Sequence, residues 1–151
     1  MDKDFFVQEI ERVSQMLYRV SFAILQNNED CKDALQQTAL KAWEKRASLR
    51  EPQYFSTWIT RILINESRNI QRKKRGLVSI ETVQEPAVDP PNPELSIIIQ
   101  SMPEKLRLPL ILQYAEGMNY EQIAKTLRLP VSTVRGRIYR AKQHLRKELE
   151  A

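Results

Sequence analysis

The feature that most constrains this chain is a stretch near its middle, from Gly76 to Glu104, that contains no lysine or arginine. Prolines at positions 86, 90, 91 and 93 interrupt this stretch, and acidic residues are scattered through it. Proline fixes φ and lacks a backbone donor, so prolines this close together prevent regular structure. A chain of 151 residues is long enough for two small domains. We therefore predict a domain at 1–75, a flexible acidic linker at 76–93, and a second domain at 94–151.

Apolar residues in the first domain recur at helical spacing. One long helix is predicted from six residues that share a face: Phe6, Ile10, Val13, Leu17, Val20 and Ile24. A second helix is expected from about Glu29 to Arg46, capped by Asn27 or Asn28. A third begins after the break at 51–52 and ends in a basic cluster at 68–75.

The second domain has the pattern of a helix-turn-helix. Pro103 opens a helix that contains Pro109 and ends near Gly117. Asn119 and Gln122 resemble a capping pair for a short helix, which is followed by a turn at 128–130 and a last helix. No strand pattern is evident, so the predicted class is all-α, with a helix-turn-helix (winged-helix-like) second domain.

Composition excludes several classes of function. The net charge of +5 and pI near 9.4 favour an anionic partner. Because Cys31 is the only cysteine and His144 the only histidine, neither a disulfide nor a Cys/His metal site is expected. No catalytic triad or glycine-rich phosphate loop is present, so we expect neither an enzyme nor a cofactor. No apolar run approaches the roughly 20 residues of a membrane span, and no signal peptide is evident, so membrane insertion is not expected.

The start of the last helix is the main candidate for DNA recognition. In helix-turn-helix geometry its first residues enter the major groove. Five residues are expected near base edges: Ser132, Thr133, Arg135, Gly136 and Arg137. Phosphate contacts are expected from Arg140, Lys142 and the hydroxyl of Tyr139. The alternative is an amphipathic surface helix with a solvated basic face.

Two further surfaces are candidates in the first domain. Tyr54, Phe55 and Trp58 precede the basic cluster, and aromatic faces beside positive charge are typical of single-strand binders. Phe55 and Trp58 are nevertheless expected to pack in the core, which leaves Tyr54 as the better candidate for contact with bases. A polar stripe beside Trp43 is predicted either to bind a partner or to face solvent: Asp33, Gln36, Gln37 and Lys41.

Four segments of the chain resemble extracytoplasmic-function (ECF) sigma factors, group 4 of the sigma-70 family. Segments 33–43 and 55–65 are similar to conserved region two, and segments 102–124 and 131–138 resemble region four. The residues depart from the family pattern at four positions, where members usually have Glu, Gly, Gly and often Ser: Gln37, Arg128, Ser132 and Gly136.

This resemblance implies a sigma factor, which directs core RNA polymerase to promoters and aids their melting. The polar stripe with Trp43 is then expected to dock on the clamp coiled coil of the largest polymerase subunit, and region four on the flap of the second-largest subunit. The expected contacts with the unpaired minus-ten element are Arg46, Tyr54, Trp58, Arg61, Asn65, Arg68, Arg72 and Lys73. The residues expected to read the duplex minus-thirty-five element are Ser132, Thr133, Arg135, Gly136, Arg137, Arg140 and Lys142.

The same resemblance implies a cytoplasmic protein that is regulated by an anti-sigma factor and held by it at the inner membrane face. Two other functions were weighed. A stand-alone dimeric helix-turn-helix regulator would suit the second domain equally well. A nucleic-acid-processing enzyme such as a recombinase would need a nucleophile and acid/base or metal-binding residues, which do not form a recognisable set.

Overall fold

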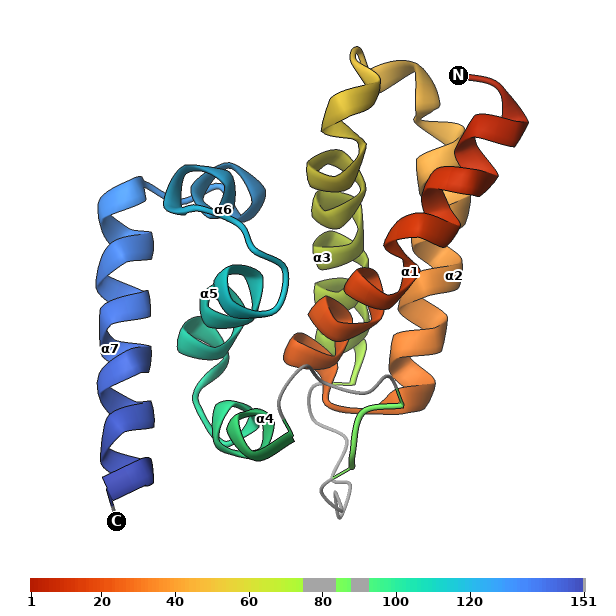
Figure 1. Cartoon of the computed structure of the whole chain (residues 1–151). Helices are drawn as coiled ribbons and strands as arrows, with labels where there is room; N and C mark the ends of the chain where they lie inside the picture. The colour runs from red at the N-terminus through yellow and green to blue at the C-terminus, as the bar shows by residue number, and fades with distance from the viewer. Residues whose placement is uncertain (75–83, 88–92, 151) are drawn as a thin grey trace. The chain divides into compact units, whose positions relative to one another are not determined.

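A computed structural model of the chain describes residues 1–74, 84–87 and 93–150. The regular elements in these residues are all helical, which confirms the predicted all-α class. The chain divides into two compact units, Met1–Val88 and Asp89–Ala151, coloured red to yellow-green and green to blue in Figure 1. Most of the predicted linker lies outside the described residues. Within it the structure describes Gln84–Ala87 and the start of the first helix of the second unit.

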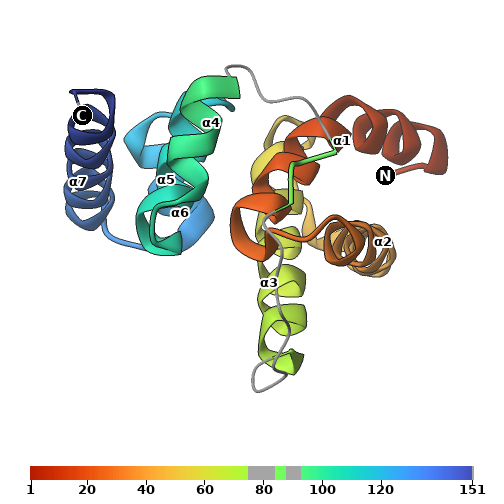
Figure 2. The same ribbon diagram turned by 90° about the horizontal axis from the view of Figure 1, so that it is seen from below.

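Three helices pack against one another in the first unit (Figures 1 and 2): α1 (Lys3–Leu25), α2 (Asn28–Glu44) and α3 (Phe55–Lys73). The apolar face predicted for α1 lies inside this bundle, with only Ile10 half-buried. Phe55 of α3 is completely buried, and its ring meets Phe6 edge-on at 6.2 Å between centroids. Burial of a side chain this large contributes roughly 1.5–3 kcal/mol to the stability of the fold. Phe6 also packs against Trp43 of α2, so these aromatic rings join the three helices.

The turn between α1 and α2 settles which asparagine is the cap. Gln26 ends α1 in the left-handed conformation, and its N–H donates to the carbonyl of Phe22 at 3.0 Å. Asn27 has extended dihedrals, and its Oδ1 accepts from the N–H of Asp30 at 2.9 Å. Asn27 is therefore the N-cap of α2, and Asn28 is the first helical residue.

The connection from α2 to α3 contains two 3₁₀ turns, η1 (Arg46–Ser48) and η2 (Pro52–Tyr54). Arg46, predicted as the last residue of the second helix, therefore lies just beyond it. Trp58 Nε1 donates to Ser48 Oγ at 2.9 Å, and this hydrogen bond fastens η1 to α3. The loop that precedes α3 is thus fixed at both ends by the helices it joins.

The second unit consists of α4 (Pro93–Gln100), α5 (Glu104–Tyr114), α6 (Tyr120–Leu127) and α7 (Val131–Glu150). A cluster of buried side chains from α4, the α4–α5 connection, α5 and α7 forms part of its core, namely Ile99, Met102, Leu110 and Ala141. Pro109 lies inside α5, as predicted, and is buried. Residues 93–150 contain no strand, so this helix-turn-helix unit has no β-wing within them.

A buried cation caps the first helix of this unit. Arg107 is only 6% exposed, and its Nη1 donates to the carbonyls of Met102 at 2.6 Å and Gln100 at 3.4 Å. The last carbonyls of a helix have no partner within it, and a cation there is favourable. Burial lowers the pKa of the Arg107 guanidinium, while the charge of Glu104 opposes this shift. Arg107 therefore holds the α4–α5 corner, a role that the sequence did not indicate.

The predicted capping box is confirmed at the start of α6. Asn119 Oδ1 accepts from the N–H of Gln122 at 2.8 Å, and Gln122 Oε1 accepts from the N–H of Asn119 at 2.9 Å. Arg128 ends α6 with φ of 56°, in the left-handed region that favours glycine. α7 follows directly, so α6, the turn and α7 form the expected helix-turn-helix.

Candidate functional site

Three helix surfaces carry the residues predicted to be functional, and the first lies on α2. Asp33, Gln36, Gln37 and Lys41 are all exposed. At about 100° per residue they span one side of the helix, with Leu40 near the middle of that side. Leu40 is 61% exposed and was not singled out by the sequence analysis, although a leucine between polar positions was a visible signal. We call these five residues the α2 face.

Trp43 does not belong to the centre of the α2 face. It is half-buried, and its ring packs against Phe6 with centroids 5.2 Å apart. The guanidinium of Arg46 lies 4.1 Å from the centre of the same ring, and Arg46 Nη1 donates to the Trp43 carbonyl at 2.8 Å. Trp43 thus joins α1 and α2 and at the same time positions Arg46.

The second surface runs along α3. Trp58 and Arg61 are half-buried, and the exposed residues that follow are Asn65, Arg68 and Arg72. At about 100° per residue these five residues lie within an arc of roughly 80°, so the helix collects them in one stripe, which we call the α3 stripe. Lys73 is exposed on the flank of the stripe.

The aromatic residues near this stripe have different environments. Phe55 is completely buried, as expected for a core residue. Trp58 is half-buried beside it, with ring centroids 5.6 Å apart. Tyr54, at the end of η2, is 58% exposed, so its ring is open to solvent at the start of α3.

The residues of the basic cluster at the end of α3 make different contacts. Lys74 Nζ forms an ion pair with Asp30 Oδ1 at 2.5 Å, and Asp30 is nearly buried at the start of α2. Arg72 donates to Asn69 Oδ1 on the helix surface. Arg75, also part of the predicted cluster, lies outside the described residues. Lys74 is therefore a structural contact between α2 and α3.

The third surface is the N-terminal half of α7. Val134, Ile138 and Ala141 are buried and fix the inward side of the helix. Four residues of the predicted set are exposed on the remaining surface of the helix: Ser132, Arg135, Arg140 and Lys142. Tyr139 is 64% exposed on this surface, and its hydroxyl accepts from Gln143 Nε2 at 2.7 Å. We call these five residues the α7 face.

The other residues of α7 that were predicted to contact DNA are less exposed to solvent. Thr133 and Arg137 are half-buried toward the flank of the helix. Gly136 is half-buried on the outward side, and a Cβ there would meet Arg140 Nη1 at 3.8 Å, an ordinary van der Waals distance. No steric requirement for glycine therefore arises within the chain at this position.

A contact that the sequence did not indicate joins the two helices of the helix-turn-helix. The Arg135 guanidinium lies 5.5 Å from the centre of the Tyr120 ring, and Tyr120 is half-buried at the start of α6. This distance is within the range of a cation–π interaction. The aromatic ring restrains the Arg135 side chain on the α7 face.

Alternative kinds of site find no support in the described part of the chain. No group of His, Cys, Asp or Glu side chains there could hold a metal ion. Cys31 is buried, and burial raises the pKa of its thiol to about 11, so the reactive thiolate is scarce near neutrality. None of the described helices is both long and apolar enough to span a membrane.

Comparison with known families and proteins identifies the family of the chain. The family "Sigma-70 region 2" matches residues 10–76, and "Sigma-70, region 4" matches residues 95–145. The RNA polymerase sigma-H factor of Pseudomonas aeruginosa is 32% identical over 143 residues, which cover 81% of this chain and 74% of that protein. The ECF sigma factor SigW of Bacillus subtilis is 28% identical over 98% of this chain and 90% of its own length.

A longer relative is also similar. The ECF sigma factor SigE of Mycolicibacterium smegmatis is 30% identical over 91% of this chain, but the match spans only 58% of SigE. Among solved structures, the sigma factor RpoE of Bartonella quintana, in complex with the anti-sigma factor NepR, has a TM-score of 0.82 and 26% identity, with 99% of each chain covered. CnrH, in complex with the cytosolic domain of CnrY, shares the fold with a TM-score of 0.75 and 23% identity over 99% of this chain. The two matched regions and these relatives show that the chain belongs to the ECF sigma factors of the sigma-70 family.

Proposed function

We propose that the three surfaces divide the work of promoter recognition. The α2 face, flanked by Trp43, docks on the clamp coiled coil of the largest polymerase subunit. The α3 stripe, with Arg46, Tyr54 and Lys73, holds the unpaired minus-ten element, and the α7 face, with its flanking residues, reads the minus-thirty-five duplex. The observation that carries this proposal is the presence of two separate basic helix surfaces, one on each compact unit, in the order of regions 2 and 4.

The chemistry of the α3 stripe suits melted DNA. Arg68, Arg72 and Lys73 are exposed cations, which attract the phosphates of a single strand, while the open ring of Tyr54 offers a surface on which a base can stack. Stacking typically contributes about 1–3 kcal/mol per base. An unpaired base held in this way stabilises the melted promoter without any hydrolysis. The polymerase then supplies all the chemistry, which agrees with a family that is not a class of enzymes.

The chemistry of the α7 face suits duplex DNA. The major groove is about as wide as a helix, and arginine pairs with guanine there through two hydrogen bonds. Arg135 and Ser132 lie near the N-terminus of α7, where base edges would be reached, whereas Arg140 and Lys142 lie further along it and suit phosphates. Thr133, Gly136 and Arg137 complete the proposed contact set beside this face.

The polymerase contacts are proposed from the α2 face and from the second unit. Leu40 is exposed among the polar side chains of the α2 face, and we propose that it packs against the polymerase at this contact. We assign the flap of the second-largest subunit to the second unit. The relatives RpoE and CnrH are in complexes with NepR and CnrY, so we also propose an anti-sigma partner, which acts in the cytoplasm or at the inner membrane face.

The test is run-off transcription with purified core polymerase, with and without this protein, on fragmented DNA from its own source. Start sites that appear only with the protein are expected, and they reveal both promoter elements. Tight, polymerase-free binding to a two-fold symmetric site, with no new transcripts, would instead establish the dimeric regulator. Metal-dependent nicking of the DNA would point to a processing enzyme.

Substitutions, each paired with a control, test the role that we propose for each surface. Arg135→Ala is expected to reduce discrimination at one minus-thirty-five position by about 1–3 kcal/mol, the value of a good base contact. Arg146→Ala, an exposed arginine further along the same helix, is the control and should preserve discrimination. Lys41→Ala should weaken core-polymerase binding, while Lys147→Ala, an exposed lysine near the end of α7, should not. Unchanged discrimination in Arg135→Ala would overturn the assignment of the α7 face.

A further inference from the structure

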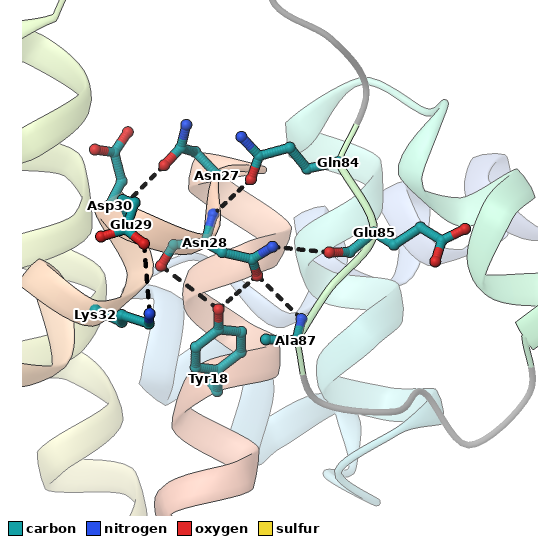
Figure 3. Close-up of polar contacts among 9 residues, drawn as sticks. All are labelled: Tyr18, Asn27, Asn28, Glu29, Asp30, Lys32, Gln84, Glu85 and Ala87. Atoms are coloured by element: carbon teal, nitrogen blue, oxygen red, sulfur yellow. Dashed lines mark hydrogen bonds and ion pairs between the residues drawn. The ribbon is translucent and has the colours of Figure 1, made fainter.

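Asn28 has a role that neither capping nor promoter recognition explains. Figure 3 shows its side chain between α1 and the segment Gln84–Ala87, which we call the strap. Asn28 Nδ2 donates to the Glu85 carbonyl at 2.8 Å, and Asn28 Oδ1 accepts from the Ala87 N–H at 3.0 Å. One amide thus satisfies both a backbone acceptor and a backbone donor of the strap.

Two further contacts complete the site. The backbone N–H of Asn28 donates to Gln84 Oε1 at 2.8 Å. This N–H belongs to the first turn of α2, where backbone donors have no partner within the helix. Tyr18, buried in α1, donates its hydroxyl hydrogen to Asn28 Oδ1 at 2.5 Å and so orients the amide (Figure 3). Burial also raises the pKa of Tyr18, which keeps its hydroxyl protonated as a donor.

Tyr18 therefore sets the orientation of the Asn28 side-chain amide independently of the strap. With Tyr18 donating to Oδ1, the amide has one orientation, in which Nδ2 faces an acceptor and Oδ1 faces a donor. These are the groups that an extended backbone offers at residues i and i+2, here the carbonyl of Glu85 and the N–H of Ala87. The side chain of Glu85 itself is exposed. Recognition is thus directed at the backbone of the strap and at Gln84.

We propose that Tyr18 and Asn28 form an intramolecular docking site whose occupant is the strap. The tether to the second unit then begins after Ala87 and not at the end of α3. An extended chain spans about 3.3–3.6 Å per residue, so a tether that starts at residue 88 instead of residue 74, just after α3, has a maximum length roughly 46–50 Å shorter. A shorter tether narrows the range of distances over which two linked modules can act together. The docking site is a property of the free chain and does not depend on the function proposed above.

The first test measures the hydrogen exchange rate of the Ala87 amide by NMR spectroscopy on the full chain. In the wild type this amide should exchange at least about tenfold more slowly than an unstructured one, because its donor is engaged. Asn28→Ala should abolish the protection. Glu85→Ala is the matched control, since only its backbone carbonyl takes part, and it should keep the protection.

Folding is checked separately. Asn27 still caps α2 in Asn28→Ala, so its circular dichroism should match that of the wild type. If Asn28→Ala fails to fold, Asn28→Leu serves in its place. Leucine keeps the approximate size of the side chain but has no polar atom that could accept from the Ala87 N–H, so protection should again be lost.

The second test addresses the tether by small-angle X-ray scattering of the full chain at matched concentration. Asn28→Ala should have a larger maximum dimension than both the wild type and Glu85→Ala. Free exchange of the Ala87 amide in the wild type, or unchanged protection in Asn28→Ala, would overturn the docking site. Identical scattering from the wild type and Asn28→Ala, with protection lost only in the variant, would overturn the effect on the tether.

Discussion

At the scale of single residues, Tyr120 restrains Arg135, the side chain that we propose reads a base of the minus-thirty-five element. Its ring lies under the guanidinium of Arg135, which would otherwise be a long and freely rotating side chain. An arginine that is already restrained loses less side-chain entropy when it binds a base. We therefore regard Tyr120 as a positioning residue for Arg135.

A pair of substitutions tests this role. An exposed cation–π contact contributes about 0.5–1 kcal/mol, so Tyr120→Leu should reduce discrimination at the base read by Arg135 by roughly two- to fivefold. Tyr120→Phe keeps a ring and should behave like the wild type. The measurement is run-off transcription on promoters with single changes in the minus-thirty-five element. In an Arg135→Ala background Tyr120→Leu should have no further effect, and an equal loss in both backgrounds would contradict the role.

Arg128 is a second informative residue, because it stands in the turn of the helix-turn-helix where family members usually have glycine. Its φ of 56° explains that preference, since the left-handed conformation costs a non-glycine residue roughly 1–2 kcal/mol. Its side chain is exposed, so little packing is lost on its removal. Arg128→Gly should therefore raise the free energy of unfolding by about 1 kcal/mol, measured by urea denaturation. Lys125→Gly, inside α6, should lower it by a similar amount, and a loss of stability in Arg128→Gly would contradict the explanation.

At the scale of elements, one side of α2 packs in the core and the opposite side is exposed to solvent. Its inward side is held by packing, with Ala34 and Ala42 completely buried, while Leu40 projects from the opposite side. An exposed leucine adds nothing to the core, so its contribution is expected in binding. The helix can therefore be altered on one face without loss of the fold.

Leu40→Ala should weaken the binding of core polymerase by about fivefold, which corresponds to roughly 1 kcal/mol. Its melting temperature should stay close to that of the wild type, because Leu40 is 61% exposed. Leu149→Ala provides the control, since Leu149 is 60% exposed in the other unit. Equal affinities of Leu40→Ala and wild type, measured by fluorescence titration, would remove the leucine from the interface.

At the scale of the whole molecule, the function that we propose splits promoter recognition between the two compact units. Each unit offers a modest basic surface, so each is expected to bind promoter DNA weakly and with strong salt dependence when alone. Fixed together on polymerase, two weak contacts act as one strong contact. This division explains why a small chain can recognise two separate promoter elements.

Arg72 and Arg135 belong to different compact units, so their substitutions are expected to be independent. The combined loss of promoter affinity in the Arg72→Ala, Arg135→Ala variant should equal the sum of the single losses within about 0.3–0.5 kcal/mol. Lifetimes of polymerase–promoter complexes provide the measurement. A double variant no weaker than one of the single variants would indicate that both arginines act at a single site.

The sequence by itself determined the features that depend on neighbouring residues. Apolar spacing predicted the helices, and Asn119 and Gln122 predicted a capping box. Such signals are local, because a helix face or a cap is defined within a few residues. The resemblance to ECF sigma factors added the two regions, which the matched families confirm.

Only the tertiary structure decided the contacts between distant segments. It made Asn27 the cap and released Asn28 to hold the strap, and it paired Lys74 with Asp30 instead of leaving it in the basic cluster. It also turned Trp43 inward against Phe6 and left Leu40 in solvent. A helical pattern places a residue on a face but does not say which other segment covers that face. That choice depends on how the helices pack, which no local pattern in the sequence specifies.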